Sequence, residues 1–324
     1  MVGVSSSIAR LTIENIEGLT QLHGKVLKDT KAVKYLNISK CGELAYLWGS
    51  EAEAYEILGG LQKLKVNRCA NLISLGEKEM PLKFVREVEI DDYRRLKSYS
   101  CPSNIEKLVI RGCHLTTSLS FPTMDGLSSS LKFLDIRRCN NMDVSWLHNK
   151  FLSSLESLYI YEMPKLRLFH EGCLSYLTKL SIWRCDNIES IPDNGYGFLP
   201  FLCLRHLEIY NCKNLKSFPH EHLQSLTSLE YMQIRDCPSL DDSFPCGLWP
   251  PTLKELSVGG LKKDISEWGL QNFPASLDKL RLIGRNSDRV VSFGAKAEEE
   301  EDKSASSSSF LLPSSLTNLH IANF

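Results

Sequence analysis

The stretch LQKLKVNRCANLISL, residues 61–75, decides the fold, because it is a clear copy of a pattern that fills the chain. Its apolar positions follow the order Leu-x-x-Leu-x-Val-x-x-Cys-x-x-Leu-x-x-Leu. Thirteen copies, some of them looser, start at residues 8, 33, 61, 85, 105, 131, 155, 177, 204, 229, 253, 277 and 316. All intervals except those of 20 and 39 residues lie between 22 and 28. The leucine-rich repeat, with a period of about 20–29 residues, is the architecture that this pattern indicates.

The spacing of the apolar residues predicts how each copy folds. Leu64 and Val66 are two residues apart, so in a strand they point to the same face, which is the interior. One unit buries too little alone, and stacked units share a continuous core. We therefore predict an α/β solenoid over residues 1–324. It is a leucine-rich-repeat horseshoe of about thirteen repeats, with a concave parallel β-sheet and a convex side of mostly loops and short helices, the clearest at 52–57 and 222–226.

Seven of the 11 cysteines occupy one position of the repeat, three residues after the last interior residue of the strand: Cys41, Cys69, Cys113, Cys139, Cys185, Cys212 and Cys237. The chain turns inward there, and a small buried thiol is a weak donor for the carbonyls of the turn. We predict buried structural thiols; a disulfide ladder or a metal cluster is the alternative.

Three segments depart from the regular repeat. The short spacing near residues 85–120 predicts local irregularity. The acidic and serine-rich run at about 295–309 has nothing to bury and predicts a surface loop, with a phosphorylation segment as the alternative. The first copy lacks a polar cap and the last stops within a unit, so we expect a domain truncated at both ends.

Composition excludes several classes of function. Lys plus Arg is 38 and Asp plus Glu is 39, a formal net charge of −1. Nucleic acid is therefore not the expected partner, and no apolar run is long enough for a membrane span. The eight histidines are scattered, and His206 with Glu208 or His220 with His222 are weak signals for catalysis or metal binding. We expect no enzymatic activity and no catalytic, cofactor-binding or metal-binding residue.

The outward strand positions predict a protein-binding face. Aromatic and arginine side chains, which are enriched in binding hot spots, gather on five consecutive strands. The alternative is that aromatic residues simply suit exposed strands. The predicted protein-binding residues of the concave face are Phe133, Arg137, Tyr159, Tyr161, Trp183, His206, Tyr210, Tyr231 and Arg235.

Earlier strands carry opposite charges at their outward positions. Lys63 and Lys65 lie on one strand, and Glu87 and Glu89 lie on the next. Pairing between the two strands is one interpretation, and a contact with a nucleotide-binding module is the other.

Several segments resemble the leucine-rich-repeat region of plant intracellular nucleotide-binding immune receptors of the coiled-coil class. They are CDNIESIP at 185–192, CKNLKSFP at 212–219, CPSL at 237–240 and WPPTLKEL at 249–256. The resemblance implies a cytoplasmic or nucleocytoplasmic sensor that recognises a pathogen effector or an effector-modified host protein. It also implies restraint of a nucleotide-binding module within the full-length receptor. The chain holds no G-x-x-x-x-G-K-[ST] motif, so ADP or ATP is expected only on that missing module.

Two other classes of repeat protein remain as alternatives. Substrate-recognition repeats of an F-box-type ubiquitin-ligase adaptor also carry Cys at this position. An extracellular receptor ectodomain favours Asn there and carries many glycosylation sequons, whereas Asn37-Ile38-Ser39 is the single match in this chain and falls in a predicted strand.

Overall fold

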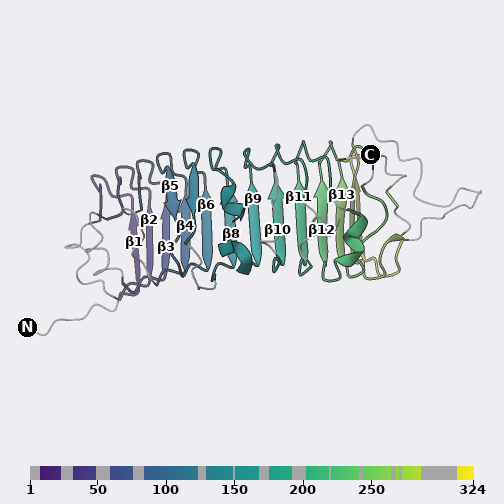
Figure 1. The fold of residues 1–324 in the computed structure, drawn as a ribbon, viewed down its shortest axis with the longest axis horizontal. Helices are drawn as coiled ribbons and strands as arrows, with labels where there is room; N and C mark the ends of the chain where they lie inside the picture. Colours follow the sequence, from purple (N-terminus) through teal and green to yellow (C-terminus); the bar gives the residue numbers. More distant parts are fainter. Residues whose placement is uncertain are drawn as a thin grey trace, which may run out of the picture. The chain divides into compact units, whose positions relative to one another are not determined.

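The computed structural model divides the chain into two compact units, Met1–Leu166 and Arg167–Phe324. The strands follow one another in chain order (Figure 1). It describes residues 8–22, 32–48, 59–75, 84–122, 129–148, 150–167, 175–191, 202–218, 220–240, 242, 244–263, 268–269, 272–285 and 312–324. Both units are built from short parallel strands stacked in chain order, and each is described by itself.

The first unit contains seven stacked five-residue strands. They are β1 (Arg10–Glu14), β2 (Tyr35–Ser39), β3 (Lys63–Asn67), β4 (Glu87–Asp91), β6 (Lys107–Arg111), β8 (Phe133–Arg137) and β9 (Ser157–Tyr161). A separate two-stranded sheet is formed by β5 (Ser98–Ser100) and β7 (Ser118–Ser120). The second unit stacks β10 (Lys179–Trp183), β11 (His206–Tyr210), β12 (Tyr231–Arg235), β13 (Glu255–Gly259), β14 (Lys279–Ile283) and β15 (Asn318–Ala322).

The predicted repeat positions are confirmed by the strands. In the described residues, each of the thirteen strands of these two stacks begins two residues after a predicted repeat start, from residue 10 for the copy at 8 to residue 318 for the copy at 316. Neighbouring strands pair like with like, so Leu36 lies opposite Leu64, and Ile38 opposite Val66. All four side chains are completely buried. The chain is thus a leucine-rich-repeat solenoid of parallel strands.

The turn after each strand uses a backbone conformation that the apolar pattern does not reveal. The φ angles of Lys40, Arg68, Asp92 and Arg138 lie between 53° and 60°. This is the left-handed region, which disfavours most side chains. The N–H group of Arg68 donates to the carbonyl of Asp91 at 2.9 Å, and that of Arg138 donates to the carbonyl of Tyr161 at 2.9 Å. The residue after the strand therefore extends the ladder of hydrogen bonds by one step.

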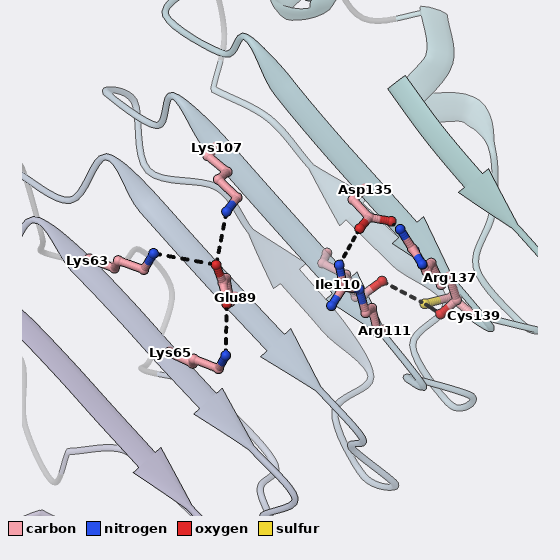
Figure 2. A network of polar contacts seen from close by, with 9 residues as sticks. All are labelled: Lys63, Lys65, Glu89, Lys107, Ile110, Arg111, Asp135, Arg137 and Cys139. Carbon is pink, nitrogen blue, oxygen red and sulfur yellow. Dashed lines mark hydrogen bonds and ion pairs between the residues drawn. The ribbon is translucent and has the colours of Figure 1, made fainter. Parts of the chain in front are cut away.

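The repeat cysteines complete the same turn. Each of the seven thiols is buried and donates to the carbonyl of the last residue of its own strand, at 3.3 Å for Cys113 and Cys139 and up to 3.7 Å for Cys212. Cys139 also approaches the carbonyl of Ile110 on the preceding strand at 3.9 Å (Figure 2). Burial raises the pKa of the Cys69 thiol to about 11. The predicted structural role of the buried thiols is confirmed, and every described cysteine is a free thiol.

The segments between strands differ in part from expectation. The described helices are short 3₁₀ helices: η1 (Ser145–His148), η2 (Lys150–Ser154) and η3 (His220–Ser225), the last covering most of the helix predicted at 222–226. The strand register of the main stack is unbroken through 85–120. The local irregularity predicted there takes the form of the extra β5–β7 pair. The predicted helix at 52–57 and the insert at about 295–309 lie outside the described residues.

Candidate protein-binding face

All nine predicted binding residues lie at outward positions of their strands and are half-buried. Four belong to β8 and β9 of the first unit: Phe133, Arg137, Tyr159 and Tyr161. Five belong to β10, β11 and β12 of the second unit: Trp183, His206, Tyr210, Tyr231 and Arg235. The alternation of interior and outward residues that the sequence predicted is present on all five strands.

A buried carboxylate organises the group in the first unit. Asp135 sits in the middle of β8 at an outward position, yet its side chain is only 1% exposed. Its two oxygens accept from Arg111 Nη2 on β6 and Arg137 Nε on β8, each at 2.6 Å (Figure 2). Short charge-assisted bonds of this kind are strong and directional. Asp135, Arg111 and Arg137, called the Asp135 cluster below, therefore present two guanidinium groups in fixed orientations.

Aromatic rings flank the Asp135 cluster. The Phe133 and Tyr159 ring centroids are 5.3 Å apart, and Lys107 Nζ lies 5.4 Å from the centre of the Phe133 ring. At the ends of the strands, the Arg138 guanidinium lies 5.5 Å from the centre of the Tyr161 ring, while its Nε donates to Glu162 at 2.9 Å. Contacts between cations and aromatic faces are favourable, so the rings and the arginines restrain one another.

A second carboxylate in the first unit gathers three lysines. Glu89 on β4 lies 3.5 Å from Lys63 Nζ and 3.2 Å from Lys65 Nζ on β3, and 3.0 Å from Lys107 Nζ on β6 (Figure 2). These four residues are the Glu89 cluster. Burial alone would raise the pKa of Glu89, but the hydrogen bonds from Lys107 and Lys65 outweigh it and lower the pKa to about 2. The predicted pairing of the charged strands is confirmed; a contact with a nucleotide-binding module stays a prediction.

In the second unit, a glutamate holds the predicted binding residues in place, and most of the groups that donate hydrogen bonds to it are uncharged. Glu208 on β11 accepts from Ser181 Oγ at 2.8 Å and from Trp183 Nε1 at 3.0 Å, and its other oxygen is 2.7 Å from His206 Nε2. These residues form the Glu208 cluster. Burial alone would raise the pKa of Glu208, but the hydrogen bonds from His206 and then Ser181 and Trp183 lower it below its ordinary value. The Trp183 ring is thereby held at its polar edge, with its apolar body beside the next strand.

Ring contacts connect the Glu208 cluster to β12. The His206 and Tyr231 rings stack with centroids 4.1 Å apart and planes 5° from parallel. Trp183 meets Tyr210 edge-on at 5.4 Å, and the Arg235 guanidinium lies 5.5 Å from the centre of the Tyr210 ring. Aromatic pairs of this geometry add about 0.5–1.5 kcal/mol to simple burial. The five predicted residues of this unit thus form one connected surface.

The histidines that the sequence singled out make contacts within the chain. The His206 and Glu208 pair lies among groups that hold it in place, and His220 is buried with Nδ1 3.0 Å from the Phe218 carbonyl oxygen. Within the residues that the structure describes, no group of three or more His, Cys, Asp or Glu side chains is arranged to hold a metal ion. Likewise, none of the described helices has the length and apolar character that crossing a membrane requires.

Sequence reasoning did not select the two carboxylates that organise these surfaces. Asp135 and Glu208 were placed at outward positions, but only the strand register brings Arg111 beside Asp135 and Trp183 beside Glu208. The available signal was an acidic residue at the middle outward position with arginine, histidine or tryptophan at the flanking outward positions.

The parallel strands and the repeat pattern define a leucine-rich-repeat domain. A family model described as "Plant disease resistance protein RPS2-like, leucine-rich repeats" matches residues 82–238. The chain is 25% identical over 229 residues to disease resistance protein RPS6 of Arabidopsis thaliana, covering 69% of this chain and 18% of that protein. It is 34% identical over 135 residues to the putative disease resistance protein At3g14460 of the same plant, covering 40% of this chain and 9% of that protein.

A solved structure agrees on the fold. The crystal structure of a TLR13–ssRNA13 complex superposes with a TM-score of 0.60 at 17% identity, covering 94% of this chain and 42% of that one. The chain is therefore similar to the leucine-rich-repeat regions of plant disease resistance proteins, and it spans less than one fifth of the length of these curated relatives.

Proposed function

We propose that this chain is the ligand-sensing region of an intracellular plant immune receptor of the nucleotide-binding coiled-coil class. It recognises a pathogen effector, or a host protein that an effector has modified, through the exposed face of its strands. The observation that carries the proposal is the similarity to disease resistance proteins across most of the chain, together with the aromatic and arginine surface of β10–β12.

The surface has the properties of a binding site prepared in advance. Trp183, His206 and Glu208 are held by short hydrogen bonds, so binding costs little side-chain ordering. Tryptophan, tyrosine and arginine dominate measured hot spots. Recognition in the cytoplasm, or in cytoplasm and nucleus, restraint of a nucleotide-binding module that carries ADP or ATP, and the lack of enzymatic activity belong to the same proposal.

The test uses a full-length receptor that contains this region, expressed in leaf tissue with a panel of pathogen effectors. The variant combines Trp183→Ala, Tyr210→Ala and Tyr231→Ala. We expect loss of the cell-death response and of co-purification with the matched effector, because about three hot-spot side chains leave the surface. Receptor accumulation stays unchanged, since all three side chains are half-buried on the outward face.

The matched control removes apolar side chains outside the strands. Tyr176 and Leu202 are 66% and 61% exposed and lie in the segments that precede β10 and β11. Tyr176→Ala with Leu202→Ala should leave recognition intact. Recognition that persists in the triple variant would refute the site.

An F-box-type ubiquitin-ligase adaptor is the second candidate. Both named relatives are disease resistance proteins, and this gives the immune-receptor proposal a support that the adaptor does not have. Co-purification of the full-length protein with a ubiquitin-ligase scaffold would favour the adaptor over the immune receptor.

A further inference from the structure

A hollow of about 620 Å³ opens in the first unit at the carboxyl ends of its strands. Basic side chains at the carboxyl ends of β3, β6 and β8 and in the turns that follow line it: Arg68, Arg111, His114, Arg137 and Arg138. Asp91 and Asp92 line it as well. Asp135 and Glu162 pair with three of the four guanidinium groups, so the charges around the hollow are balanced and the Arg68 guanidinium is the one without an ion pair among the described residues.

Two of the guanidinium groups are fixed before any ligand arrives. Asp135 binds Arg111 through Nη2 and Arg137 through Nε, each at 2.6 Å, and is itself almost completely buried (Figure 2). A guanidinium has five N–H donors, and this carboxylate engages one donor nitrogen on each arginine. Arg111 Nε is buried without a hydrogen-bond partner within the described part of the chain. The Asp135 cluster therefore holds surplus donors in a rigid frame.

Arg68 and His114 are not neutralised in the same way. Neither the Arg68 guanidinium nor the His114 imidazole makes a hydrogen bond or ion pair with any part of the chain that the structure describes, and both are exposed. Arg138 is anchored through Nε to Glu162 and lies over the Tyr161 ring, which also borders the hollow. The hollow thus combines fixed donors, an unpaired guanidinium and one aromatic wall.

We propose that this hollow binds a phosphate group, carried by a phosphate ester or a polyphosphate. Phosphate offers several charged oxygens to forked guanidinium donors, the pairing that arginine makes best. The volume exceeds that of one phosphate and suits a ligand of about drug size.

This site goes beyond the proposed function, since it takes a different class of ligand. It overlaps the nine predicted protein-binding residues at Arg137 and Tyr161, whereas Arg68 and His114 follow the strands and lie outside them. Two sources supply phosphate groups: free polyphosphate, or a phosphorylated side chain of a partner protein.

The test is isothermal titration calorimetry of the complete 324-residue chain at low salt, with inorganic tripolyphosphate in one arm and a phosphoserine peptide in the other. We expect saturable binding in at least one arm, and the stronger arm identifies the source. Arg68→Gln should weaken that binding about tenfold, the effect of losing one charge-assisted hydrogen bond. Asp91→Asn should tighten it, because Asp91 forms no ion pair or side-chain hydrogen bond with the described residues and only repels the anion.

Two further variants distinguish binding at this hollow from a general effect of the charge of the chain. Arg137→Gln should also weaken binding, but it disturbs Asp135, so Arg68→Gln is the decisive variant. Lys213→Gln removes one positive charge from an exposed lysine of the second unit and should leave the affinity within about twofold. Absence of binding in both arms, or equal effects of Arg68→Gln and Lys213→Gln, would overturn the proposal. Effector recognition by the Arg68→Gln receptor is a separate readout and distinguishes this failure from that of the proposed function.

Discussion

The two units share one repeated backbone structure but carry different side chains on the exposed faces of their strands. In the first unit, lysines and arginines converge on Glu89 and Asp135 (Figure 2). In the second unit, Glu208 is satisfied by a hydroxyl, an indole N–H and an imidazole, and stacked rings surround it. Interior positions are the same in both, and the thiol turn recurs in both.

This difference shows that the repeat determines the position of each outward side chain but not which residue type occupies it. Outward positions touch neighbours on adjacent strands, so a change on one strand must be matched on the next. The first unit solves this with charge pairing, and the second with hydrogen bonding and ring stacking. The predictions below test how far the two solutions differ in strength.

Removal of the Asp135 carboxylate should have the largest effect. Asp135→Ala leaves Arg111 and Arg137 side by side with no counter-charge, and we expect a loss of about 3 kcal/mol in the free energy of unfolding. Urea denaturation followed by circular dichroism measures it. Glu230→Gln is the control, because its pairs with Lys254 and Arg205 are exposed and their loss should change the free energy of unfolding far less. Equal losses in the two variants would contradict a central role for Asp135.

The sequence was sufficient to predict the repeated strands and the turns that follow them. The two-residue spacing of interior side chains placed every described strand of the main stacks, and the shared cysteine position predicted the thiol turn. The left-handed turn residue escaped notice, because the position holds residues that favour this conformation in some repeats, such as Asn211 and Gly112, and residues that do not in others, such as Arg68. Their conformation is imposed by the hydrogen bond to the next strand, which is a tertiary contact.

The candidate site was predictable in part. The alternation of strand residues gave the nine outward side chains, but it could not give the burial of Asp135, because long arginines from two strands fold over it. For the same reason Lys107 was missing from the predicted pairing of Lys63 and Lys65 with Glu89. Such contacts depend on side-chain conformation across strands, and the repeat pattern does not contain that information.

Salt and acid should distinguish the Glu89 cluster from the Glu208 cluster. Glu89→Gln should cost about 1–2 kcal/mol at low salt, with much of that loss removed in 1 M NaCl, where the screening length is about 3 Å. Glu208→Gln should cost a similar amount with little dependence on salt, because Ser181 and Trp183 are neutral donors. Unfolding in urea at two salt concentrations measures both.

The pH profile supplies the control for this comparison. The pKa of Glu89 is about 2 in the folded chain against 4.5 as its ordinary value, so its contribution is complete above pH 4.5 and is lost as the pH falls towards 2. Glu89→Gln should flatten the decline of stability across that window. A variant whose acid profile matches that of the unchanged protein would show that the three lysines do not stabilise the ionised carboxylate.

The smallest effect is expected where the units are alike. Cys139→Ala in the first unit and Cys212→Ala in the second each remove a buried thiol whose single S–H group lies within reach of two backbone carbonyls. We expect each to cost about 1 kcal/mol, because the S–H donor is weak and the cavity left is about the size of a methyl group. Urea denaturation of both variants measures the costs side by side. If the costs of the two substitutions differed by much more than this, the turns of the two units would not be equivalent. The outward clusters would then affect the packing of the interior.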